Sequence, residues 1–154
     1  GNEPGRGVRL FVQYLLDGKP RAITPEGVSS VRVFHAVSPD GRSVLVAGPD
    51  RRIAVYSIEP SEPRPVPGLG IEDLSIRWTA DGRSLYVWRS SAPPGRIDLV
   101  DVETGRRTLW KEFRPPDPAG VLQVGPVVIT PDGSSYVYSY RRVLDELHLA
   151  TGIR

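Results

Sequence analysis

Cysteine is absent from the 154 residues, so the chain can form neither disulfides nor thiolate sites, and the redox compartment stays open. Histidine occurs only at His35 and His148, and lysine only at Lys19 and Lys111. Two distant histidines without cysteine or a local carboxylate cluster do not supply a zinc site. The sequence therefore predicts no metal and no cofactor.

Long hydrophobic runs are also missing. The uninterrupted apolar stretches are only a few residues long, whereas a membrane-spanning helix needs about 20. No segment resembles a signal peptide, and we predict no direct membrane insertion. The opening GNEPGRG has no start-like character, which favours a piece of a longer polypeptide.

Positive charge is sparse in net terms, at +2, and comes almost entirely from arginine. The arginine pairs at 51–52, 106–107 and 141–142 are isolated from one another, and β-type residues follow each pair. A nucleic-acid groove needs one basic face with stacking aromatic rings, and the sequence shows neither. We interpret the pairs as solvated strand ends and predict no nucleic-acid partner.

Catalytic motifs are missing as well. The sequence contains no Gly-x-Ser-x-Gly elbow, no phosphate loop, no dinucleotide-binding fingerprint and no kinase catalytic motif. We therefore predict that this chain is not an enzyme, although a parent protein could carry a kinase or hydrolase domain outside it.

What the sequence does contain is a repeat. Three segments share an Asp-Gly turn between apolar runs: FHAVSPDGRSVLVAG (34–48), SIRWTADGRSLYVWR (75–89) and PVVITPDGSSYVYSY (126–140). Serine or threonine precedes each turn, and a serine recurs two residues after each glycine. A period of about 45 residues is typical of repeat architectures such as propellers. His35 takes a place that Ile76 and Val127 fill in the other copies, which predicts a packed core histidine.

The chemistry of tight turns explains the repeated residues. Proline presets φ, aspartate is favoured next, and glycine takes the left-handed conformation of a bulged hairpin. A hydroxyl before the turn can bond the turn backbone. We therefore interpret the aspartates as structural turn residues rather than metal ligands or catalytic acids. The same role is predicted for the whole set: Ser38, Asp40, Gly41, Thr79, Asp81, Gly82, Thr130, Asp132 and Gly133.

The strands beside these turns are apolar on both faces, as in SVLVAG, SLYVW and PVVIT. Stacked propeller blades bury both faces of each sheet, whereas a two-sheet sandwich leaves one face exposed. We predict an all-β fold, a partial β-propeller of about three to four antiparallel four-stranded blades in an incomplete ring. The predicted units are a half blade of two final strands (8–24), two blades (31–67 and 73–113) and an incomplete last blade (124–154).

The S/T-P-D-G-x-S hairpins at this period resemble the TolB-like, WD-like bacterial propeller repeats over nearly the whole chain. The tail SSYVYSYRRVLDELHLATGIR (134–154) is similar to the end of propellers that follow the kinase domain in some bacterial membrane-anchored serine/threonine kinases. This resemblance implies a bacterial protein in an extracytoplasmic or periplasmic location. It also implies that a strand from the start of the full propeller completes the last blade.

Two insertions lengthen loops of the repeat, SSAPPGR (90–96) and RPPDPAGVLQVG (114–125). Long loops on a rigid scaffold are where recognition usually resides. Aromatic residues flank both loops, and they either anchor a partner or pack between blades. The candidate partner-binding residues are Trp88, Trp110, Phe113, Arg114, Pro115 and Asp117.

Three hypotheses for the function remain open. The chain is a non-catalytic recognition or scaffold module that binds a protein, peptide or extracytoplasmic ligand, as in the sensor region of a bacterial receptor kinase. Alternatively, it is the accessory gating propeller of a serine peptidase or other hydrolase. As a third alternative, it is a self-assembling structural fragment, because unpaired blade edges invite strand pairing that yields a homo-oligomer.

Overall fold

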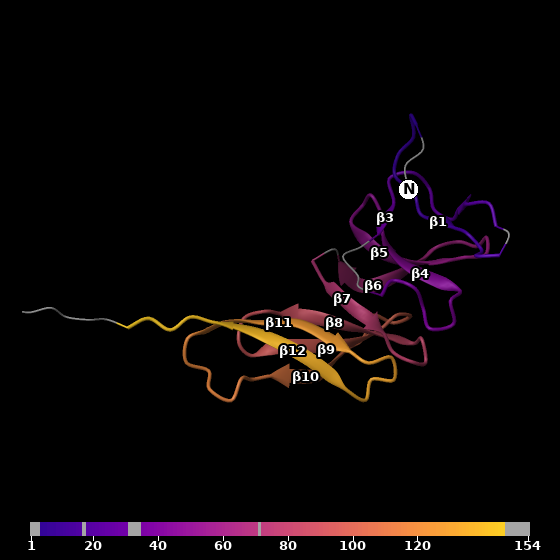
Figure 1. Cartoon of the computed structure of the whole chain (residues 1–154). Coiled ribbons are helices and arrows are strands. Elements are labelled where there is room, and N and C mark those ends of the chain that lie inside the picture. The colour runs from indigo at the N-terminus through magenta and orange to yellow at the C-terminus, as the bar shows by residue number, and fades with distance from the viewer. Residues whose placement is uncertain (1–3, 17, 31–34, 71, 147–154) are drawn as a thin grey trace, which may run out of the picture.

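The computed structural model describes residues 4–16, 18–30, 35–70 and 72–146, and within them it contains β-strands and no helix (Figure 1). Twelve strands form four antiparallel sheets. The first and last sheets have two strands each, and the two sheets between them have four. The all-β prediction is therefore confirmed. The described residues therefore include no helix that is long and apolar enough to span a membrane.

Each sheet is a simple meander, in which strands that follow one another in the chain are paired. The N-terminal ribbon comprises β1 (Phe11–Val12) and β2 (Arg21–Ala22). The first four-stranded sheet comprises β3 (Ser29–Ser30), β4 (Ser43–Ala47), β5 (Arg52–Ser57) and β6 (Arg64–Gly70).

The second four-stranded sheet comprises β7 (Leu74–Trp78), β8 (Ser84–Ser90), β9 (Gly95–Asp101) and β10 (Arg107–Phe113). The C-terminal hairpin comprises β11 (Val121–Ile129) and β12 (Tyr136–Arg142). The sequence also predicts a strand within 142–152. Residues 143–146 are not strand, and the rest of that segment lies outside the described residues.

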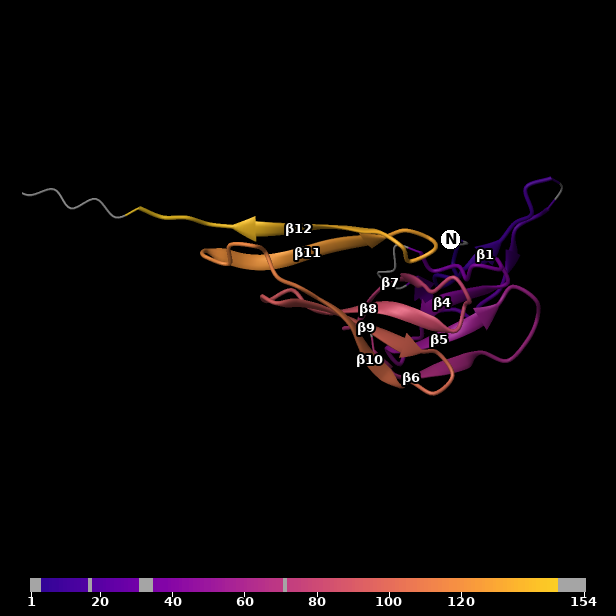
Figure 2. The ribbon, with the colours of Figure 1, turned by 90° about the horizontal axis from the view of Figure 1, so that it is seen from below.

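The second sheet is buried on both faces, as its composition predicts. Along β8, Leu85 and Val87 pack in the cluster shared with the first sheet, whereas Tyr86 and Trp88 pack in the cluster shared with the C-terminal hairpin. Alternate residues of a strand point to opposite faces, so one strand serves two interfaces. Figure 2 shows this stacking, with the hairpin lying over β8, β9 and β10.

Hydrogen bonds tie each sheet to the backbone of the next. The Trp78 indole N–H donates to the Ala36 carbonyl at 3.0 Å, which joins the second sheet to the first. The Arg77 guanidinium donates to the Ile129 carbonyl at 2.6 Å, which joins the second sheet to the hairpin. Both donors lie on β7, the first strand of the second sheet, so this strand contacts the sheet before it and the hairpin after it.

Candidate functional site

The three Asp-Gly turns have one geometry. The hydroxyls of Ser38, Thr79 and Thr130 donate to the aspartate two residues on, at 2.6, 2.6 and 2.5 Å. The same hydroxyls accept the backbone N–H of the serine that follows each turn, at 2.9 to 3.0 Å. All three turn glycines have φ near +70°, a conformation that favours glycine.

These bonds hold the turn carboxylates in their charged form. The Ser38 hydroxyl lowers the pKa of Asp40, and the Thr79 hydroxyl lowers that of Asp81. Hydrogen bonds from Thr130 and then Ser134 lower the pKa of Asp132 to about 2. A carboxyl with such a pKa is a poor proton donor near neutral pH, so the geometry favours a structural role. Within the described ranges, no three His, Cys, Asp or Glu side chains gather as metal ligands would.

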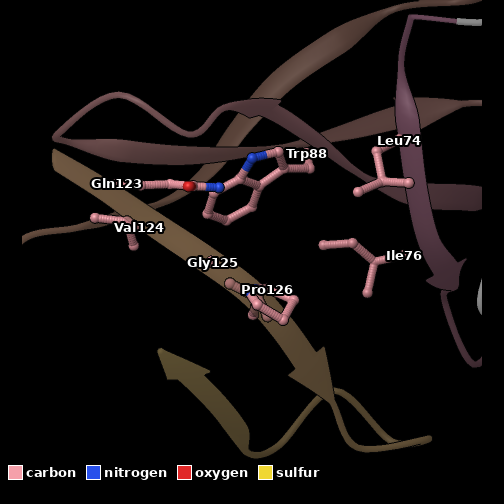
Figure 3. Close-up of a pocket in the computed structure, with 8 residues that line it drawn as sticks. Leu74, Ile76, Trp88, Gln123, Val124, Gly125 and Pro126 are labelled. Carbon is pink, nitrogen blue, oxygen red and sulfur yellow. The ribbon is translucent and has the colours of Figure 1, made fainter. Parts of the chain in front are cut away.

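A cavity of about 180 Å³ lies where the second sheet meets the C-terminal hairpin (Figure 3). The indole of Trp88, from β8, forms one wall, and Leu74 and Ile76 from β7 form another. Both β7 and β11 are the first strands of their sheets in chain order, so the cavity lies between corresponding strands of neighbouring sheets. The remaining lining residues all come from β11: Gln123, Val124, Gly125, Pro126 and Val127.

Two glycines allow the Trp88 ring to lie where it does. A Cβ atom at Gly95 would stand 2.9 Å from Cη2 of the indole, and one at Gly125 would stand 3.0 Å from Cζ2. Real Cβ atoms essentially never show the approach at Gly95, and the approach at Gly125 is tighter than nine in ten real Cβ contacts. The ring is therefore held between two backbone segments, which makes the wall of the cavity rigid.

The lining defines what this Trp88 pocket can bind. Ile76, Val124 and Val127 are buried and apolar, and Gln123 is an exposed amide at the rim. None of the lining side chains titrates, so the pocket offers no general acid, base or nucleophile. An apolar floor with one polar group at the edge suits an apolar side chain whose own backbone needs a hydrogen-bond partner.

Two further predicted partner-binding residues pack inside the protein instead. Phe113 is 2% exposed, and its ring lies 5.2 Å from the rings of both Tyr136 and Tyr138 on β12. Trp110 is half-buried, with its ring 4.9 Å from that of Tyr86. The prediction that Phe113 contacts a partner is therefore wrong, because the C-terminal hairpin covers its ring. The alternative, packing between sheets, is what the structure shows for this ring.

Ion pairs hold the segment that follows β10. Arg114 pairs with Glu112 at 2.8 Å, and Asp117 pairs with Arg142 of β12 at 2.6 Å. Pro115 is buried, so its predicted contact with a partner is also corrected. Arg114 and Asp117 are exposed and lie apart from the lining of the Trp88 pocket. Of the six candidates, Trp88 is the one that lines the cavity described above.

His35 is exposed rather than packed in a core, which corrects the prediction from its repeat position. It lines an open cavity of about 510 Å³ together with Arg77 and Asp132. The aligned residues Ile76 and Val127 are buried because a neighbouring sheet covers them in the cluster that they share. No such cover lies over His35 among the described residues.

No protein-family model matches the sequence, and no curated protein sequence matches it. Among solved structures, the crystal structure of TolB from Acinetobacter baumannii is similar to this one, with a TM-score of 0.50 and 13% sequence identity. The likeness covers 86% of this chain. The fold is a partial β-propeller. Each four-stranded sheet is thus one blade, and the chain spans only 37% of the length of TolB.

Sequence reasoning missed most of the Trp88 pocket. Leu74, Ile76 and Gln123 carry no motif, because an apolar or amide side chain on a strand is ordinary. The available signal was glycine: Gly95 is the second-last residue of the first insertion, and Gly125 is the last residue of the second. Glycine inside a strand often marks a close approach by another group. That group is Trp88.

Proposed function

We propose that this chain is a non-catalytic recognition module, and that its Trp88 pocket binds an apolar side chain of a protein or peptide partner. The observation that carries the proposal is the cavity of about 180 Å³ with an apolar floor and a fixed aromatic wall. A dry apolar cavity of about 150 Å³ holds a benzene molecule. The pocket is therefore large enough for an aliphatic or aromatic side chain.

Rigidity of the Trp88 pocket supports the same function. The indole contacts backbone on two sides, at Gly95 and Gly125, so the ring loses little freedom when a ligand packs against it. Sites that are ordered before binding avoid much of the entropic cost of association. Aromatic residues are also enriched among the residues that dominate binding energy.

Gln123 supplies the polar part of the proposed recognition. Its amide is exposed at the rim and can donate to a peptide carbonyl and accept from a peptide N–H. A side chain anchored against Trp88 would bring its own backbone to this rim. The pocket therefore favours a peptide segment over an isolated hydrocarbon.

The test is selection from a random peptide library displayed on phage, using the whole chain as bait. Selected peptides should share an apolar anchor and bind the purified chain in a fluorescence anisotropy titration. Leu74→Asp puts a charge at the half-buried wall of the pocket and should weaken binding at least tenfold. Leu109→Asp is the matched control, since Leu109 is 58% exposed and does not line the pocket. Equal binding by both variants would refute the assignment of this site.

We further propose that the module is the sensor region of a bacterial receptor kinase and lies outside the cytoplasm. The support is the similarity of residues 134–154 to the ends of such propellers. Sequencing the reading frame upstream of Gly1 tests this context. A kinase domain followed by one hydrophobic span is the expected result, and an α/β-hydrolase segment would favour a peptidase gate instead.

A further inference from the structure

The indole N–H of Trp88 is a hydrogen-bond donor that no described residue uses. Trp88 is half-buried, and its ring nitrogen is not closed off from solvent. Trp78 provides the contrast, because its indole N–H already donates to the Ala36 carbonyl at 3.0 Å. Figure 3 shows the Trp88 nitrogen on the side of the ring away from Ile76 and Pro126. The Trp88 pocket therefore combines an apolar interior with an unused donor at its rim.

The stretch of β11 beside the pocket is poorly suited to pairing with an added strand. The Val124 N–H already donates to the Ser91 carbonyl at 2.9 Å, and Pro126 has no N–H. The Gly125 carbonyl already accepts the Ser139 hydroxyl at 2.8 Å. Recognition by strand addition depends on main-chain hydrogen bonds, and two of the donors that it needs are missing here. A ligand of this pocket is therefore held by side chains rather than by a strand ladder.

The polar groups at the rim select a ligand that offers carbonyl oxygens. The Trp88 indole can only donate, and the exposed Gln123 amide donates as well as accepts. An N–H on the anchored residue would instead enter beside the buried side chains of Ile76 and Val127. Burying such a donor without a partner costs binding free energy. Proline carries a carbonyl and no N–H, so it fits both the rim and the floor.

The shape of the pocket favours the same residue. Trp88 presents a flat aromatic wall that is held against backbone at Gly95 and Gly125, and Leu74 and Ile76 form the facing wall. Proline-rich segments bind other proteins by packing in aromatic-lined grooves of this kind. Such segments adopt the polyproline II conformation before they bind, so little conformational entropy is lost on association.

We propose that the ligand of the Trp88 pocket is an extended, proline-containing segment in the polyproline II conformation. This inference rests on the proposed function and names the class of peptide that the pocket takes. A proline ring packs on the indole, and a carbonyl of the segment accepts the Trp88 N–H. The Gln123 amide donates to a second carbonyl. A polyproline II segment makes no hydrogen bonds of its own, so its carbonyls are free to accept both.

A fluorescence anisotropy titration of the whole chain with a labelled oligoproline tests the class of ligand. A peptide of alternating alanine and serine is the control, because it has an N–H at every position. Oligoproline should bind saturably and compete with the peptides selected from the random library, whereas the control peptide should not. Leu74→Asp should weaken oligoproline binding at least tenfold, and Leu109→Asp, at an exposed residue of β10, should leave it unchanged.

NMR of the tryptophan side chains tests the hydrogen bond without any substitution in the pocket. The chain has three tryptophans, so the spectrum of the 15N-labelled protein contains three indole N–H signals. Oligoproline should move the Trp88 indole proton downfield and leave that of Trp78, which is bonded inside the protein, in place. Trp88→Phe keeps an aromatic ring but no donor, and should weaken binding by roughly threefold to tenfold.

The outcomes separate this inference from the proposed function. Library peptides that bind at the pocket without proline, together with no binding of oligoproline, would overturn the inference and leave the proposed function standing. Bound oligoproline with an unmoved Trp88 indole signal would overturn it as well. Library peptides that bind Leu74→Asp as well as they bind the unmodified chain would refute the proposed function and this inference together.

Discussion

Gly125 lies directly against the indole of Trp88: a Cβ atom at this glycine would stand 3.0 Å from Cζ2 of the ring. The two residues belong to neighbouring blades, and the φ of Gly125 is +116°, where side chains are strained. This close approach of backbone and ring forms the Trp88 pocket and also fixes the position of the hairpin on the second sheet.

Gly125→Ala should therefore destabilise the protein. Both the contact with the ring and the backbone conformation oppose a methyl group, and strain of this kind costs about 1 to 3 kcal/mol. Gly70→Ala is the matched control, because its Cβ would meet nothing within 4 Å and its φ is not in the left-handed region. Urea denaturation measures the free energy of unfolding of both variants. Equal stability for the two would contradict the account of the pocket wall.

The aromatic cluster under the hairpin should carry much of the stability of the C-terminal half. Phe113→Ala removes a ring that is 2% exposed, and buried Phe→Ala substitutions cost about 3 to 5 kcal/mol. Leu109→Ala, on the same strand but 58% exposed, should change stability by about 0.5 kcal/mol or less. If thermal or urea denaturation shows similar losses, Phe113 is not the anchor that its burial indicates.

The turn carboxylate of Asp132 should make the fold sensitive to acid. Its pKa of about 2 lies below the ordinary value of 3.8, so the folded state favours the charged form. The resulting stabilisation is present above about pH 4 and is lost as pH falls toward about 2. Side-chain carbon chemical shifts measured by NMR over this range report the titration of Asp132.

Thr130→Val removes the largest cause of this low pKa and should move the titration of Asp132 upward. Thr130→Ser keeps a hydroxyl at the same place and should leave the pKa low. An unchanged pKa of Asp132 in Thr130→Val would mean that the hydroxyl of Thr130 does not stabilise the charged form of this carboxylate.

The Asp-Gly turns could be predicted from sequence because their chemistry is local. The hydroxyl of Ser38, the carboxylate of Asp40 and the glycine after it act on one another within a few residues. The strands that are apolar on both faces likewise predicted stacked sheets. In β8, for example, apolar residues occupy both faces of the strand, and both faces are buried.

The Trp88 pocket could not be predicted in the same way, because it depends on contacts between distant segments. Gly125 and Trp88 come together only when the hairpin packs on the second sheet. His35 was predicted to be buried from its position in the repeat, yet it is exposed. The burial of a repeat position also depends on whether a neighbouring sheet covers it. Phe113 flanks a long loop and so suggested a partner contact, yet the hairpin covers it.

The most direct measurement on the proposed function is a set of intermolecular NOEs between a selected peptide and the whole chain. Protons of the peptide's apolar anchor should show NOEs to the indole of Trp88 and to the methyl groups of Leu74 and Ile76, which line the pocket. NOEs only to residues elsewhere, such as those beside the Asp-Gly turns, would contradict recognition at the Trp88 pocket.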